Sequence, residues 1–68
     1  MHNGHRIIKK GDIFTMFGIQ FEFLDIEDDT IVLRDHRTGN RFIYGLRAFQ
    51  HLAYQNGYEV KEEKHDGI

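Results

Sequence analysis

A chain of 68 residues has room for one thin hydrophobic core, and the absence of cysteine excludes both disulfide reinforcement of that core and thiolate metal sites. The net charge of −2 gives no general reason to bind a polyanion, and neither a signal-peptide h-region nor an apolar membrane span is present, so we expect a cytoplasmic protein without membrane contact. The six Phe, three Tyr and 29% charged residues are typical of a folded domain rather than a disordered linker. We expect 1–68 to be a single domain, folded over 6–60 and ending in a charged tail at 61–68.

The first predicted hairpin combines two apolar segments, 13–17 and 19–23. The first follows a turn dipeptide and is typical of a strand, whereas the second alternates strictly between apolar and polar residues, so its apolar side chains share one face. We expect a tight turn at Phe17-Gly18. The preceding segment 6–10 is too short to classify.

The alternation slips at residues 23–24, where two apolar side chains are adjacent, and this slip indicates a β-bulge or a sharp bend. A turn at 27–30 leads into a strand at 31–35. A second hairpin follows, because the loop 37–40 contains a glycine and precedes another strand at 41–44.

The apolar period changes to the helical value after Gly45. The helical stripe consists of Leu46, Phe49, Leu52 and Ala53. Gly57 is a natural C-terminal stop, which gives a helix of roughly eleven residues, and 58–60 can add a short edge strand.

These elements predict a mainly β fold with one short helix, in which four to five antiparallel strands form a bent meander. Two arrangements stay open: a small SH3-like barrel, or an open sheet covered by the helix. In either one the helix is too short to persist alone in water, so its apolar stripe must pack against the sheet.

The chain offers little for catalysis. Serine is absent as well as cysteine, which excludes the usual nucleophilic triads, and the glycines stand singly at turns rather than in a phosphate-binding loop. Of the five histidines, His2 and His5 lie near the N-terminus, His65 lies in the charged tail, and His36 and His51 are each isolated, so a metal site would depend entirely on tertiary placement. We therefore expect no enzyme activity, no bound metal and no cofactor.

Charge is unevenly distributed along the chain. Residues 22–29 carry five acidic side chains, whereas 34–47 carry a net charge of +3 in which every basic residue is Arg. Arginine suits bidentate contacts with carboxylates or phosphates and stacking on aromatic rings. The partner-binding residues that we expect are Arg34, Arg37, Arg41, Arg47, Phe42 and Tyr44.

A second candidate patch consists of Asp25, Glu27, Asp28 and Asp29. Clustered carboxylates can hold a divalent cation or act as an acid/base pair. This run lacks the calcium-loop pattern, and adjacent acidic residues at a strand end are commonly just a solvated turn.

We expect a non-enzymatic binding or regulatory module that acts through a protein–protein interface. Stand-alone acidic chains of this size are often accessory proteins of bacteria or their phages, which suggests an inhibitor or accessory factor of a larger bacterial or phage-targeted protein. The uneven charge also permits a homo-oligomer, through opposite patches or through sheet edges.

The alternative function is a single-stranded nucleic-acid-binding module, with arginines on phosphates and Phe42 or Tyr44 stacking on bases. The acidic net charge weighs against it. The plainest interpretation of the arginines is a solvated surface paired internally with Asp35 and Glu22.

Overall fold

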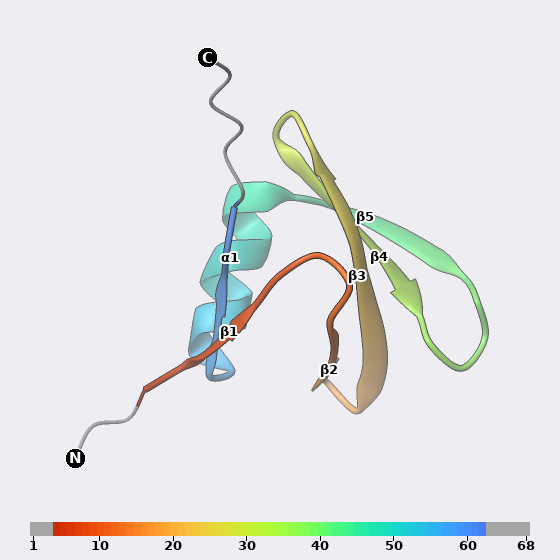
Figure 1. Ribbon diagram of the computed structural model, residues 1–68, viewed down its shortest axis with the longest axis horizontal. Helices are drawn as coiled ribbons and strands as arrows, with labels where there is room; N and C mark the ends of the chain where they lie inside the picture. The colour runs from red at the N-terminus through yellow and green to blue at the C-terminus, as the bar shows by residue number, and fades with distance from the viewer. Residues whose placement is uncertain (1–3, 63–68) are drawn as a thin grey trace.

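The computed structural model describes residues 4–62, which form an open four-stranded antiparallel sheet with a helix over one face and a separate pair of short strands beside the helix (Figure 1). The elements in chain order are β1 (Arg6–Ile8), β2 (Ile13–Met16), β3 (Ile19–Glu27), β4 (Thr30–Asp35), β5 (Arg41–Gly45), α1 (Leu46–Gln55) and β6 (Tyr58–Val60). The mainly β fold with one helix is confirmed, and of the two predicted arrangements the structure has the open sheet rather than a closed barrel. From residue 63 onward the predicted charged tail lies outside the described residues.

Within residues 4–62, no helix is long and apolar enough to cross a membrane.

The hairpin between β2 and β3 closes through a two-residue turn, as predicted. Met16 lies opposite Ile19, and the two residues between them, Phe17 and Gly18, have φ angles of +56° and +75°. Positive φ at both positions is the type I′ geometry, whose twist matches that of the flanking strands. Phe17 carries a side chain in this left-handed region at a cost of about 1 kcal/mol.

The predicted bulge is present in β3. The register against β4 shifts between Phe23 and Asp25, so Leu24 is the extra residue. Beyond the bulge the strand continues, and Ile26 lies opposite Ile31 and packs against the core. The bulge therefore returns the apolar alternation to the face that α1 covers.

The hairpin between β4 and β5 is also confirmed. Gly39 has a φ of +82°, a conformation that glycine adopts without steric cost. The Asp35 carboxylate accepts hydrogen bonds from the backbone N–H groups of Arg37 at 2.8 Å and Thr38 at 3.2 Å. These bonds fix the loop at the end of β4.

Helix α1 packs on the sheet through the predicted stripe. Leu46, Phe49 and Ala53 are buried, while Leu52 is partly exposed at the margin of the contact. Gly57 follows the helix with a φ of +89°, so the predicted stop is confirmed. The core comprises Ile8, Phe14, Met16, Phe21, Phe23, Ile31, Leu33, Leu46, Phe49 and Ala53.

A parallel pair formed by β1 and β6 lies outside the antiparallel meander, beside α1 (Figure 1). Arg6 lies opposite Tyr58, and the backbone N–H of Lys61 extends the pairing by donating to the Ile8 carbonyl at 2.9 Å. The short strand at 58–60 was predicted, but its parallel pairing with β1 was not. Ile8 is fully buried, so β1 contributes to the core.

Candidate functional site

The sheet face turned away from α1, here called the outer face, brings the two sequence-predicted patches together. Strand alternation directs Phe23, Leu33 and Phe42 toward α1, and the intervening residues away from it. An open depression of about 380 Å³ on this face is lined by Leu24, Asp25, Glu27, Val32, Arg34, Arg41 and Ile43. The outer face is defined by these residues together with Glu22, which lies opposite Arg34.

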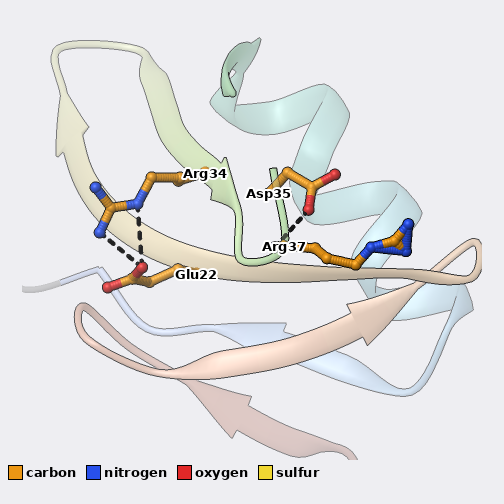
Figure 2. Close-up of polar contacts among 4 residues, drawn as sticks. All are labelled: Glu22, Arg34, Asp35 and Arg37. Atoms are coloured by element: carbon orange, nitrogen blue, oxygen red, sulfur yellow. Dashed lines mark hydrogen bonds and ion pairs between the residues drawn. The ribbon is translucent and has the colours of Figure 1, made fainter. Parts of the chain in front are cut away.

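An ion pair joins β3 to β4 across the outer face. Arg34 donates to the same carboxylate oxygen of Glu22, Oε1, from Nε at 3.2 Å and from Nη2 at 2.8 Å (Figure 2). Both side chains are partly exposed, so the pair contributes a few tenths of a kcal/mol to stability and mainly fixes the two side chains. The interpretation of internally paired arginines is thus confirmed for Arg34 with Glu22.

Arg41 lies opposite Arg34 in the β4–β5 register, so two guanidinium groups adjoin on one face. Glu22 forms its ion pair with Arg34 and not with Arg41. Within residues 4–62, Arg41 makes no ion pair with a carboxylate. A positive charge therefore stays available at the β5 side of the outer face.

Arg37 is not paired with Asp35 through its side chain. The Asp35 carboxylate accepts from the backbone N–H of Arg37, and the Arg37 side chain extends away from it (Figure 2). The hydrogen bond from that backbone N–H is the main reason why the pKa of Asp35 lies below its usual value of 3.8. Asp35 thus shapes the loop and leaves the exposed Arg37 guanidinium free of it.

The two predicted aromatic residues lie on the opposite face of the sheet from Arg34 and Arg41. Phe42 packs edge-to-face on Phe21 with the ring centroids 5.8 Å apart, and Tyr44 stacks on Phe49 at 5.9 Å. Their rings contact the core beneath α1. The six predicted partner-binding residues therefore do not form one surface, and Arg47, exposed on α1, is separate from the β4–β5 pair.

The acidic patch is also divided. Asp25 lies on the outer face and forms an ion pair with Lys10, with Nζ and Oδ1 3.3 Å apart, while its Oδ1 also accepts from the backbone N–H of Ile26. Asp28 and Asp29 are exposed in the turn between β3 and β4. The turn thus carries negative charge at one end of the β4–β5 hairpin, and the Arg residues lie toward the other end.

Potential metal ligands do not gather in the described part of the chain. Within residues 4–62 there is no group of three or more His, Asp or Glu side chains placed to hold an ion. His5 stacks on Tyr54 with the ring centroids 4.1 Å apart, whereas His2 and His65 lie outside the described residues.

Sequence reasoning missed the apolar part of the outer face. Val32 and Ile43 lie opposite each other, beside Leu24, and the Ile43 side chain is 66% exposed. The signal was present in residues 41–44, since strand alternation places Ile43 on the same side as Arg41 and opposite to the two aromatic residues.

Comparison with protein-family models, with curated proteins and with solved structures found no match to this chain.

Proposed function

We propose that this chain is a non-enzymatic binding module that docks onto another protein through its outer face. The observation that carries the proposal is the unequal covering of the sheet. Helix α1 covers one face, whereas the other exposes Ile43, with the half-buried Val32 next to it, beside the guanidinium groups of Arg34 and Arg41. Apolar side chains interleaved with arginine are the composition enriched where proteins bind one another.

We further propose that the module is a regulator or inhibitor that occupies a surface of a larger cytoplasmic protein in a bacterium or in a phage-infected cell. The outer face suits this role because it presents fixed charges: the Glu22–Arg34 ion pair holds a negative and a positive group in defined positions. Fixed charges of both signs favour one orientation of a partner over others.

The geometry gives less support to the alternative, single-stranded nucleic-acid binding. A single-strand binder combines cationic groups with aromatic rings on one surface. Here Phe42 and Tyr44 face the core side of the sheet, while Arg34 and Arg41 face the other side, next to the Glu22 and Asp25 carboxylates.

The experiment exchanges the two charges of the outer-face ion pair, Glu22→Arg together with Arg34→Glu. The exchange retains the ion pair and the net charge, and it replaces the like-charged contact between residues 34 and 41 with an attractive one, so we expect the fold to be retained. We expect recovery of a protein partner in affinity capture from a cell lysate to fall about tenfold or more, with or without nuclease treatment.

The matched control is the exchange Glu59→Arg with Lys61→Glu, which alters exposed residues around β6 and should leave recovery unchanged. Equal recovery by the outer-face variant and the wild-type chain would reject the outer face as the docking surface. Recovery of nucleic acid alone, lost between about 50 and 200 mM salt, would support the alternative function instead.

A further inference from the structure

One edge of the four-stranded sheet, the outer side of β5, has backbone groups that no strand among residues 4–62 pairs with. Antiparallel pairs alternate between hydrogen-bonded and non-hydrogen-bonded positions. The bonds from Asp35 N to Asn40 O at 2.8 Å and from Leu46 N to Asp29 O at 2.7 Å fix this alternation at the two ends of the hairpin. The N–H and C=O groups that point away from β4 are therefore those of Arg41, Ile43 and Gly45.

The opposite edge of the sheet, β2, is capped by side chains. By the same alternation the outward groups of β2 belong to Ile13 and Thr15. Arg6 Nη2 donates to the Ile13 carbonyl at 3.1 Å. The Tyr58 hydroxyl donates to the Thr15 carbonyl at 2.9 Å and accepts from the Thr15 N–H at 3.4 Å. An incoming strand would have to displace these groups.

Within residues 4–62, strand β5 lacks two features that commonly protect an edge, a proline and a β-bulge, and its one charged residue, Arg41, stands at its first position. The chain contains no proline, and the β4–β5 register runs without a bulge. Its middle residues are apolar or aromatic, and Ile43 is 66% and Tyr44 38% exposed. An edge of this kind is a template for pairing with another strand.

The two ends of β5 carry opposite charges. Arg41 begins the strand, and at its other end the backbone of Leu46 is bonded to Asp29 in the acidic turn, next to Asp28. When two copies of β5 pair antiparallel, the Arg41 end of each meets the acidic end of the other, so the attraction occurs twice. A parallel arrangement would place like charges together.

We propose that the β5 edge binds the β5 edge of a second copy of this chain, antiparallel and about a two-fold axis at Ile43, to give a continuous eight-stranded sheet. Ile43 then pairs with Ile43 of the second copy, and Arg41 with Gly45 of the second copy, for a total of about six backbone hydrogen bonds. Because Gly45 has no side chain, the Arg41 guanidinium extends over it toward the acidic turn of the second copy. Two-fold pairing uses both open edges, so assembly stops at the dimer.

The first test is sedimentation of the full chain over concentrations from about 10 µM to about 1 mM, a range suited to a small interface. We expect a monomer–dimer equilibrium in the wild-type chain. Ile43→Lys places two ammonium groups against each other at the axis and should raise the dimer dissociation constant about tenfold or more. Ile7→Lys is the matched control, because Ile7 is 58% exposed on β1, and it should leave the constant unchanged.

The second test is a charge exchange between two chains. Arg41→Glu alone, and Asp28→Lys with Asp29→Lys alone, each place like charges at both contacts, so each variant should be monomeric. An equimolar mixture should dimerise again, because every contact in the mixed pair joins opposite charges. Adding Ile43→Lys to both variants should abolish this rescue.

A wild-type chain that stays monomeric at about 1 mM overturns the proposal. Equal effects of Ile43→Lys and Ile7→Lys, or a mixture that fails to associate, overturn it as well. The exchange of Glu22 and Arg34 described above changes no residue of β5 and leaves the backbone pairing at Ile43 in place, although it gives Arg41 an acidic neighbour at position 34. It should therefore weaken the dimer far less than Ile43→Lys does, even where it abolishes partner capture. Partner docking through the outer face and dimerisation through β5 can therefore be disproved separately.

Discussion

The two edges of the sheet belong to strands of similar length and composition, yet only one of them is capped. Strand β2 has Arg6 and Tyr58 bonded to its outward backbone groups, while β5 has no such cover within residues 4–62. The strands themselves do not explain the difference. It arises because β1 and β6, the parallel pair, lie on the β2 side and supply one capping side chain each.

The capping residues also support each other. The Arg6 guanidinium lies over the Tyr58 ring, 5.9 Å from its centroid, and the two residues are register partners in the parallel pair. The cap on β2 therefore depends on the docking of β1, which in turn depends on the fully buried Ile8. Substitutions in β1 and at Tyr58 can therefore test why the two edges differ.

The largest effect is expected from undocking β1 with Ile8→Ala. Removing a fully buried isoleucine side chain should lower the free energy of unfolding by about 2 to 5 kcal/mol, measured by chemical denaturation. The neighbouring substitution Ile7→Ala is the control, since the exposed Ile7 side chain should contribute less than about 0.5 kcal/mol. Similar losses in the two variants would show that β1 does not pack against the core.

A smaller effect is expected from Tyr58→Phe, which removes only the hydroxyl that caps Thr15. The variant retains the ring and its contact with Arg6 but loses the bond to the Thr15 carbonyl at 2.9 Å and the longer bond from the Thr15 N–H at 3.4 Å, so the loss should be about 1 to 2 kcal/mol. With the Thr15 backbone groups uncovered and only Arg6 left to cap the β2 edge, the variant should associate beyond a dimer at high concentration, which light scattering would detect.

Tyr54→Phe is the matched control for this variant, because the Tyr54 hydroxyl is exposed on α1 and makes no hydrogen bond to any other described residue. It should change neither the free energy of unfolding nor the state of association. If association increases in both variants, or in neither, the Tyr58 hydroxyl does not protect the β2 edge.

The hairpins of this fold were predictable because their signals are local. The turn at Phe17-Gly18, the slip at Leu24 and the glycine in the β4–β5 loop each indicated a feature within a few residues, and the structure has all three. The parallel pair was not predictable in this way. Each of its strands is three residues long, too short to show a period, and the two are separated by almost the whole described chain.

The candidate site was predictable in its residue types but not in its geometry. Charge counts identified the arginines, yet they ignored strand parity, which separates Arg41 from the neighbouring Phe42. The edge caps had no sequence signal, since they depend on Tyr58 reaching a backbone carbonyl 43 positions away. Features that depend on tertiary placement are those that a single sequence does not reveal.

The smallest effect concerns two partly exposed carboxylates, one near each edge strand. Asp12 precedes β2 and accepts the backbone N–H of Lys9 at 2.9 Å, while Asp35 ends β4 and accepts the N–H of Arg37. Each of these backbone hydrogen bonds is the main cause that lowers the pKa of its carboxyl below the usual 3.8.

Because the pKa of each carboxyl is lowered by folding, its stabilising contribution is present above pH 3.8 and is lost as the pH falls through the lower, folded-state value. The contribution of these two carboxyls to the free energy of unfolding should therefore be constant near neutral pH and decline below pH 3.8.

Asp12→Asn and Asp35→Asn retain an acceptor oxygen but have no titrating proton, so each should make the decline of stability in acid shallower. Asp35→Ala lacks the acceptor and should lower stability at neutral pH too, in denaturation curves recorded across the acid range. If the free energy of unfolding declines as steeply in acid in both asparagine variants as in the wild-type chain, these carboxylates do not stabilise the fold through their ionised form. If only one variant declines less steeply, only the carboxylate changed in that variant does so.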